Sequence, residues 1–348
     1  MSKRKIALIT GVTGQDGALL AGFLLKKNYI VHGVRRRSSS IVSSVRLDKI
    51  FQEKFLKKKS FFLHYGDVLD ASFCHEIVLK TKPNEIYHLA AQSHVAISFE
   101  LPNYTTSTNA LGTLNLLEAI RHQKEKIRFY NAATSEMYGT LSTKYQDENT
   151  AFKPQSPYAI SKLYSYWLTK NYRESYNLFA SNGILFNHES EKRGETFVTR
   201  KISLFIANYS KTNKGVLYLG NLNSKRDWGY APDYVEGMWK ILNFKKADDF
   251  VLATGKSYSV KDFLLRGFKL INVKIKFIGK GLNEKAIDLK TKKTVVKSIK
   301  HYYRPSEVKN LIGKSSKALK LLKWKSKTSF NDLVKKMILY DIKNITKK

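Results

Sequence analysis

Short apolar runs alternate with amphipathic segments through the first half of the chain. Residues 5–10, KIALIT, form an apolar run that ends at a glycine, which is typical of a strand buried in a parallel sheet. Leucines at helical spacing follow in residues 18–27. The same alternation predicts further strands at residues 30–34, 61–65, 85–89, 127–132 and 180–185, and helices at 71–80, 111–122 and 158–176.

Strands that alternate with helices over this length predict an α/β fold with a doubly wound, mostly parallel Rossmann sheet. We expect residues 1–186 to form a dinucleotide-binding domain. The pattern loosens afterwards, with helices expected at 196–210 and 233–244 and a strand at 250–253. We therefore expect residues 187–348 to form mainly a smaller C-terminal substrate-binding lobe, with some segments returning to the first domain.

A glycine-rich turn lies between the first predicted strand and the first predicted helix. Its sequence is Gly11-Val-Thr-Gly14-Gln-Asp-Gly17, a GxxGxxG spacing that differs from the simpler GxGxxG fingerprint. Glycines permit a tight turn and let backbone N–H groups approach a diphosphate at a helix N-terminus. Three glycines alone are a weak signal, but their place after the first strand indicates a dinucleotide site.

The second predicted strand ends in Arg35-Arg36-Arg37. An enzyme that selects NAD usually has a carboxylate near this point, which holds the ribose 2′-hydroxyl. Arginines suit the additional 2′-phosphate of NADP instead. NADP is therefore the expected cofactor.

Two later segments fit the same cofactor site. Asp67, just past the third strand, is placed either to accept a hydrogen bond from an adenine amino group or simply to form a turn. Leu89-Ala-Ala-Gln-Ser93 follows the fourth strand with mostly small side chains. Such side chains would let a cofactor lie against the backbone.

Tyr158 and Lys162 lie four residues apart and so share one helix face. A cation beside a phenol favours the phenolate, so we expect a lowered tyrosine pKa and a base that takes a proton from a sugar hydroxyl. The fifth strand leads into Thr134 and Glu136, which would project to the same side if the backbone stays extended. The threonine can hydrogen-bond the reacting hydroxyl, and the carboxylate can remove a proton next to a new ketone.

Composition narrows the choice of partners. The net charge of +34 comes mostly from scattered lysines, without a nucleic-acid motif, so we expect no nucleic-acid partner. The chain has no apolar run long enough for a membrane span and no signal-peptide pattern, so we expect no membrane partner and a cytoplasmic location. The single cysteine, Cys74, excludes an internal disulfide and a cysteine-rich metal site, and we expect no metal.

Longer strings resemble the GDP-mannose 4,6-dehydratases, a family within the extended short-chain dehydrogenase/reductases. They run from the glycine turn, through Leu63-His-Tyr-Gly-Asp67 and Gly183-Ile-Leu-Phe-Asn-His-Glu-Ser190, to Arg226-Asp-Trp-Gly229 and Tyr303-Arg-Pro-Ser-Glu-Val308. The resemblance implies a lyase that converts GDP-mannose to GDP-4-dehydro-6-deoxy-mannose and water. It implies bound NADP that carries hydride from C4 to C6, and a homotetramer or homodimer.

The resemblance also implies a role for individual residues. Tyr158 would remove the O4 proton, with Lys162 and Thr134 assisting, and Glu136 would act at C5 and C6. The cofactor contacts it implies are Gly11, Val12, Thr13, Gly14, Gln15, Asp16, Arg36, Asp67, Val68, Leu89, Ala90, Ala91, Gln92, Ser93, Tyr104, Lys162, His188 and Arg193. The GDP-sugar contacts it implies are Asn187, Lys201, Arg226, Arg304 and Glu307.

The chain departs from the family pattern at Ala133 and Ser161, which do not carry the chemistry, and in the lysine-rich segment 281–301. Three other functions remain open. A 4-epimerase would share the tyrosine and lysine but would have no use for Glu136. Another 4,6-dehydratase would act on dTDP-glucose or UDP-N-acetylglucosamine. A non-catalytic polyanion-binding protein would use the positive charge alone.

Overall fold

The computed structural model describes residues 4–36, 46–47, 59–140, 143–304, 306, 308 and 310–345. Its largest element is a seven-stranded sheet with the order β11-β6-β5-β4-β1-β2-β3, in which every neighbouring pair is parallel. The strands are β1 (Ile6–Thr10), β2 (Ile30–Arg35), β3 (Phe61–Tyr65), β4 (Glu85–His88), β5 (Arg128–Thr134), β6 (Phe179–Leu185) and β11 (Phe250–Leu252). The predicted doubly wound sheet is confirmed.

Strand β1 is buried on both faces, which explains its unbroken apolar sequence. Ala7 and Ile9 belong to a core cluster on one face of the sheet, together with residues of α1 (Gln15–Lys26) and α9 (Ala231–Leu242). Leu8 points the other way and belongs to a cluster with residues of α3 (Ala71–Thr81) and α6 (Gly112–Arg121). Alternate side chains of a strand point to opposite faces, so both faces require apolar residues here.

Further helices follow strands β4 and β5. Helix α7 (Pro157–Ser175) begins where sequence rules place a helix start, because the Ser156 side chain accepts a hydrogen bond from the Ala159 N–H at 3.1 Å and a proline opens the helix. It packs beside α6 and three short elements. These are α4 (Val95–Glu100), α5 (Pro102–Thr106) and the π-helix η2 (Ser107–Leu111).

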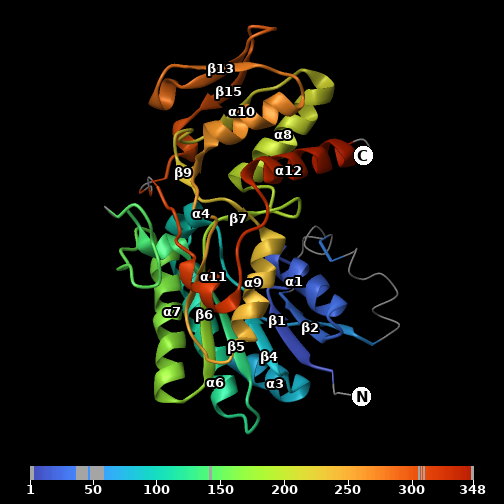
Figure 1. Cartoon of the computed structure of the whole chain (residues 1–348), viewed down its shortest axis with the longest axis vertical. Helices are drawn as coiled ribbons and strands as arrows, with labels where there is room; N and C mark the ends of the chain where they lie inside the picture. The colour runs from blue at the N-terminus through green and yellow to red at the C-terminus, as the bar shows by residue number, and fades with distance from the viewer. Residues whose placement is uncertain are drawn as a thin grey trace.

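A second, smaller lobe stands above the carboxyl ends of the sheet strands (Figure 1). It holds a four-stranded sheet with the order β13-β14-β15-β8, packed against three helices around a separate apolar core. Its elements are α8 (Val198–Thr212), β8 (Leu217–Leu219), α10 (Val260–Leu270), β13 (Ile275–Ile278), η4 (Gly281–Asn283), β14 (Lys285–Asp288), β15 (Thr294–Ser298), η5 (Lys300–Tyr302) and α12 (Phe330–Ile345).

The chain passes between the two lobes more than once. Helix α9 packs on α1, strand β11 pairs with β6, and α11 (Ser316–Leu322) packs beside them, so these late segments lie with the large sheet. Two small sheets complete the fold. They are β7 (His188–Glu189) with β10 (Gly229–Tyr230), and β9 (Lys225–Arg226) with β12 (Tyr258–Ser259).

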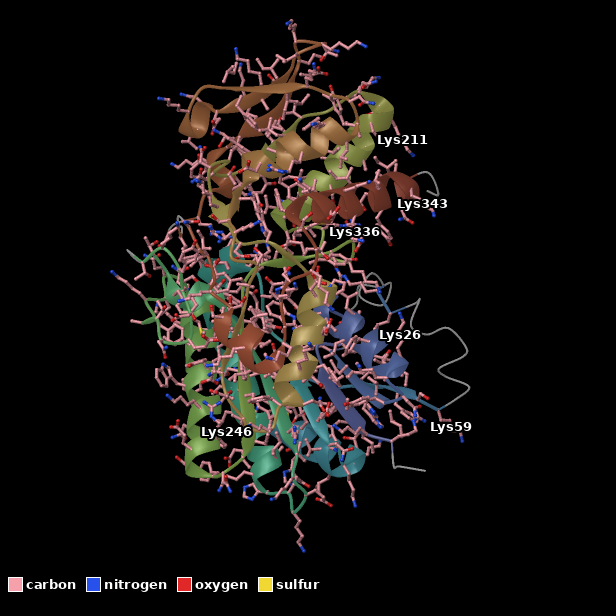
Figure 2. The ribbon with its side chains drawn as sticks, viewed as in Figure 1. Lys26, Lys59, Lys211, Lys246, Lys336 and Lys343 are labelled. Atoms are coloured by element: carbon pink, nitrogen blue, oxygen red, sulfur yellow. The ribbon has the colours of Figure 1, made fainter. Side chains whose placement is uncertain are left out.

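The lysine excess is distributed over the molecule. Of the labelled lysines, Lys211, Lys336 and Lys343 lie on the smaller lobe, whereas Lys26 and Lys246 lie around the large sheet (Figure 2). Among the described residues, no helix is both long and apolar enough to cross a membrane.

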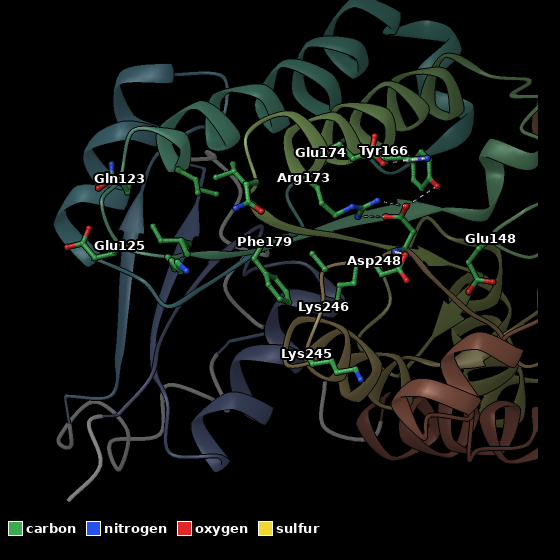
Figure 3. A pocket seen from close by; sticks show the side chains of 18 of the residues that line it. Gln123, Glu125, Glu148, Tyr166, Arg173, Glu174, Phe179, Lys245, Lys246 and Asp248 are labelled. Carbon is green, nitrogen blue, oxygen red and sulfur yellow. Dashed lines mark hydrogen bonds and ion pairs between the residues drawn. The ribbon is translucent and has the colours of Figure 1, made fainter.

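A buried ion pair fastens the edge strand β11 to the rest of the large sheet. Both terminal nitrogens of Arg173 on α7 donate to the Asp249 carboxylate at 2.9 Å, and the Asn182 amide and the Tyr166 hydroxyl donate to the same group. Arg173 and Tyr166 point toward this carboxylate at the wall of a cavity of about 860 Å³ (Figure 3). Burial raises the pKa of Asp249, but the hydrogen bond and charge of Arg173 outweigh it, so the pKa lies below its ordinary value of 3.8.

Asp249→Asn should therefore destabilise the protein by about 3–5 kcal/mol at pH 7, because it leaves the buried Arg173 charge uncompensated. Urea unfolding measures this loss. The lowered pKa means that the stabilisation is present above pH 3.8 and disappears as the pH falls through the folded-state value. Glu174→Ala is the matched control, because its pair with Lys170 on the same helix is exposed and 3.9 Å long. Equal effects of the two substitutions would contradict the prediction.

Candidate active site

The carboxyl ends of β1, β4 and β5 meet the junction between the lobes. Ligands bind at this edge in open α/β sheets. The glycine turn follows β1, residues 89–93 follow β4, and Thr134 ends β5. The junction segments β7 and β9 contribute His188 and Arg226.

The glycine turn has the shape that a phosphate site requires. Gly11 has a φ of 69°, and a Cβ there would lie 2.8 Å from the Ala90 nitrogen, so no other residue fits. A Cβ on Gly17 would lie 2.3 Å from the Gly11 carbonyl oxygen. Gly14 is the N-cap of α1, and no side chain caps the helix there. The first backbone N–H groups of α1 can therefore face an anion.

A polar chain connects this turn to the segment after β4, and the sequence analysis did not identify it. The Thr10 hydroxyl accepts the N–H groups of Leu89 and Ala90 at 3.2 Å and lies 2.9 Å from Nδ1 of His88. Burial, followed by the charge of Lys162, lowers the pKa of His88 to about 3, so the ring is neutral. The Thr113 hydroxyl donates to the Asn109 carbonyl and therefore accepts from Nε2 of His88, which leaves Nδ1 to accept the Thr10 hydrogen. The sequence offered one indication of these contacts, which is that a threonine ends the apolar first strand.

Asp16 and His188 form an ion pair between α1 and β7. His188 Nε2 lies 2.8 Å from the Asp16 carboxylate, and Nδ1 lies 2.7 Å from the Phe186 carbonyl. Both ring nitrogens face acceptors, so both carry hydrogen and the ring is cationic. Burial lowers the pKa of His188, but Asp16 raises it above its ordinary value; burial likewise raises the Asp16 pKa, which the His188 charge brings below normal.

The Gln15 side chain adds three hydrogen bonds to this contact between α1 and β7. Its amide donates to the Asp16 carboxylate at 2.9 Å and to the His188 carbonyl at 3.1 Å, and it accepts from the Ser190 hydroxyl at 2.8 Å. The predicted cofactor residues Gln15, Asp16 and His188 are thus brought together. Their contacts fix the glycine turn relative to the start of the smaller lobe.

The remaining predicted cofactor residues lie along the same edge. The Arg36 guanidinium donates to the Tyr104 hydroxyl. Asp67 accepts from the Leu69 N–H at 3.1 Å and so forms a turn, and Gln92 is held by Asn109 and Thr105. The other predicted positions around the turns are Val12, which is buried, Thr13, Val68, Ala91 and Ser93, which is exposed.

Thr134 and Tyr158 lie together at the end of β5. A hydrogen bond joins the two side chains, and the phenol also interacts with the charges of Glu136 and Arg193. The expected lowering of the Tyr158 pKa does not occur in the protein alone. Burial raises this pKa to about 12, against the effect of Thr134.

The reason lies partly in the position of Lys162. Its ammonium donates to the Ala132 carbonyl at 2.9 Å, and its charge does not contribute to the shift of the tyrosine. Burial lowers the pKa of Lys162 to about 8. Four-residue spacing placed both side chains on one helix face, but it did not specify where the long lysine side chain ends.

Glu136 also reaches the site by a different route from the one expected. Strand β5 ends at Thr134, and Glu136 lies in the 3₁₀ helix η3 (Ser135–Tyr138), so alternation along an extended strand does not apply. The carboxylate is nevertheless buried at the junction. It lies 3.6 Å from Nε of Arg226 and 4.0 Å from a terminal nitrogen of Arg304.

The predicted substrate residues come from the smaller lobe and its connections. Arg226 donates a hydrogen bond to the Val308 carbonyl at 2.8 Å. The Lys201 ammonium lies 4.0 Å from the centre of the Tyr302 ring. The Asn187 carbonyl accepts from the Gly229 N–H. Glu307 lies outside the described residues.

Arg193, a predicted cofactor residue, pairs with Glu189 at 3.1 Å and stacks on Phe197. Within the described part of the chain, no group of three or more His, Cys, Asp or Glu side chains could hold a metal ion.

Comparisons with solved structures agree with this architecture. UDP-glucose 4-epimerase from Thermotoga maritima, solved with UDP-glucose, superposes with a TM-score of 0.80 at 21% identity and covers 99% of this chain and 100% of its own. dTDP-glucose 4,6-dehydratase from Bacillus anthracis, solved with NAD, gives a TM-score of 0.77 at 17% identity and covers 98% of both chains. At these identities the likeness establishes the fold alone.

Sequence comparisons establish the family. The sequence profile of GDP-mannose 4,6 dehydratase matches residues 8–337. The GDP-mannose 4,6 dehydratase of Dictyostelium discoideum is 49% identical over 346 residues, 99% of this chain and 97% of the relative. The GDP-mannose 4,6-dehydratase of Sinorhizobium fredii is 51% identical over 344 residues, 98% of both chains. This chain therefore belongs to the GDP-mannose 4,6-dehydratase family.

Proposed function

We propose that this protein converts GDP-mannose to GDP-4-dehydro-6-deoxy-mannose and water, as an NADP-dependent lyase. The observation that supports this most is a buried carboxylate, Glu136, beside the Thr134–Tyr158 pair. A 4-epimerase needs the tyrosine but no second base. Relatives named for the dehydratase at 49–51% identity support the same choice.

NADP fits the residues at the proposed cofactor site. The uncapped start of α1 and the close approach of Gly11 to Ala90 leave backbone N–H groups for a diphosphate. The sequence from Arg35 to Leu47 contains no carboxylate to hold a ribose 2′-hydroxyl. Arg36, at the end of β2, can pair with a 2′-phosphate.

The first step removes hydrogen from C4 and O4 of the hexose. When bound, the dinucleotide takes up the C4 hydrogen with its electron pair, later returns it to C6, and in its oxidised form carries a positive charge. Tyr158 accepts the O4 proton. With a pKa of about 12 in the protein alone, its phenol is neutral at pH 7, so it needs a nearby cation to act as a base. Thr134 orients the phenol and the reacting hydroxyl.

The second step uses Glu136. A ketone at C4 acidifies the C5 hydrogen, which the carboxylate removes as a proton. The resulting carboxylic acid donates its proton to the C6 hydroxyl, which leaves as water. When C6 regains hydride, C5 takes up one proton, which balances the proton that Tyr158 removed from O4 and restores both side chains. Arg226 and Arg304, on segments of the other lobe, orient the carboxylate and supply positive charge for the GDP diphosphate.

The protein is also proposed to form a homodimer or homotetramer. Ile160, Tyr164 and Trp167 are exposed at successive turns of α7, and the exposed Leu111 of η2 lies on an element that packs against α7. These apolar side chains form one helical face, which a second copy of the same face would bury.

Glu136→Gln should reduce the rate of dehydration by about 10²- to 10⁴-fold, because the amide cannot accept the C5 proton. Tyr158 remains, so oxidation at C4 should continue and reduced cofactor should accumulate. Nicotinamide absorbance and mass spectrometry of the sugar measure the two steps. Glu100→Gln, at an exposed position of α4, is the matched control. Wild-type turnover by Glu136→Gln would refute the role.

Tyr158→Phe should stop the reaction one step earlier, with a loss of about 10²- to 10⁴-fold and no accumulation of reduced cofactor. Stopped-flow absorbance after mixing with GDP-mannose distinguishes it from Glu136→Gln. Tyr218→Phe removes an exposed hydroxyl from β8 of the smaller lobe, outside the proposed interface, and should retain normal turnover. Normal C4 oxidation by Tyr158→Phe would contradict the assignment.

Trp167→Glu should dissociate the oligomer, because it places a charge in the middle of the proposed apolar face. Sedimentation velocity measures the change in mass. Leu265→Glu, at an exposed apolar position on α10 of the other lobe, should leave the mass unchanged. An unchanged mass for Trp167→Glu would exclude this face as the interface.

A further inference from the structure

Arg46 lies directly against the glycine turn, although it is distant from the turn in sequence. Its Nε donates to the Lys192 carbonyl at 2.8 Å, and one terminal nitrogen donates to the Thr13 carbonyl at 3.2 Å. The Lys192 ammonium donates back to the Arg46 carbonyl at 3.1 Å. The next residue, Leu47, is fully buried in the core cluster that includes α1, which holds this segment in place.

The guanidinium lies beside the N-terminus of α1, where an anion binds favourably. Thr13 immediately precedes Gly14, the cap of α1, so the cation lies near the positive end of the helix dipole. Burial lowers the pKa of Arg46; of the neighbouring charges, Glu195 acts most strongly and raises this pKa, and Arg200 and Arg193 lower it. Glu195 already supplies negative charge beside Arg46, and the helix N-terminus adds positive potential on the side of the glycine turn, which favours a further anion there.

Two nitrogens of the guanidinium are held by backbone carbonyls. The second terminal nitrogen of Arg46 lies 3.8 Å from the position that a Cβ on Gly194 would occupy. A guanidinium with Nε and one terminal nitrogen anchored by carbonyls has a fixed plane. A fixed plane suits an arginine that pairs with phosphate oxygens.

We propose that Arg46 binds the diphosphate of the dinucleotide, together with the N–H groups at the start of α1. The inference rests on the proposed function only in that a dinucleotide occupies this turn. Arg46 would then hold the two phosphates, and Arg36, at the end of β2, would hold the 2′-phosphate. The two arginines serve different groups of one cofactor.

The test measures binding of three probes by calorimetry, without turnover. NADP⁺ carries both kinds of phosphate group, ADP-ribose carries only the diphosphate, and adenosine 2′-monophosphate carries only the 2′-phosphate. Arg46→Met should weaken the first two by about 10- to 100-fold, the size expected for a charge-assisted hydrogen bond, and change the third by less than about 2-fold. Arg46→Lys keeps the positive charge but loses the paired N–H donors of the guanidinium. It should therefore give a smaller loss of affinity for the same two probes.

Arg36→Met is the matched control and should show the complementary pattern, with weaker binding of NADP⁺ and adenosine 2′-monophosphate but not of ADP-ribose. Equal loss of all three probes in Arg46→Met would show damage that extends beyond the diphosphate site, and this outcome, unchanged binding, or loss confined to the 2′-phosphate would each overturn the proposal. Failure of the proposed reaction would be distinct, because product would be absent although wild-type protein binds ADP-ribose. If Arg46→Met does not fold, Arg46→Lys provides the comparison.

Discussion

The structure depends on one constraint, the parallel alignment of seven strands in one sheet. Parallel strands place all their carboxyl ends at the same edge, so segments far apart in sequence meet there. The glycine turn after β1, the small residues after β4 and Thr134 at the end of β5 all come from this edge. Without that alignment the proposed cofactor residues and the proposed catalytic residues would not lie at one edge of the sheet.

The site also requires fixed contacts between the two lobes, because its residues come from both lobes. The cationic His188 ring on β7 is bonded to Asp16 on α1, and its other nitrogen faces the Phe186 carbonyl. Strand β7 also pairs with β10, three residues beyond Arg226. The same short segment thus connects the cofactor turn to the arginine that faces Glu136.

Burial favours the uncharged forms of three side chains at this site. The protein without ligands holds Tyr158 as a neutral phenol and His88 as a neutral ring, and it lowers the pKa of Lys162 to about 8. Each shift favours the uncharged form, as desolvation requires. Under the proposed function, the phenol of Tyr158 therefore needs positive charge from a bound ligand to act as a base.

The sequence by itself determined the sheet and the glycine turn, and it supplied the candidates for the catalytic side chains. Apolar periodicity and glycine spacing are local properties, and they predicted the strands that became β1 to β6 and the helices that became α1, α3, α6 and α7. Strings shared along the chain likewise indicated the family, which the comparisons establish.

Only the tertiary structure decided how the side chains meet. A 3₁₀ turn, rather than strand alternation, brings Glu136 to Arg226, and a carbonyl on β5 receives Lys162. The edge strand β11 depends on Asp249 contacting Arg173, 76 residues earlier. Arg46 belongs to no motif in the sequence, and only its contact with Thr13 in the folded chain places it beside the glycine turn. These are long-range contacts, which depend on packing and burial rather than on any local pattern in the chain.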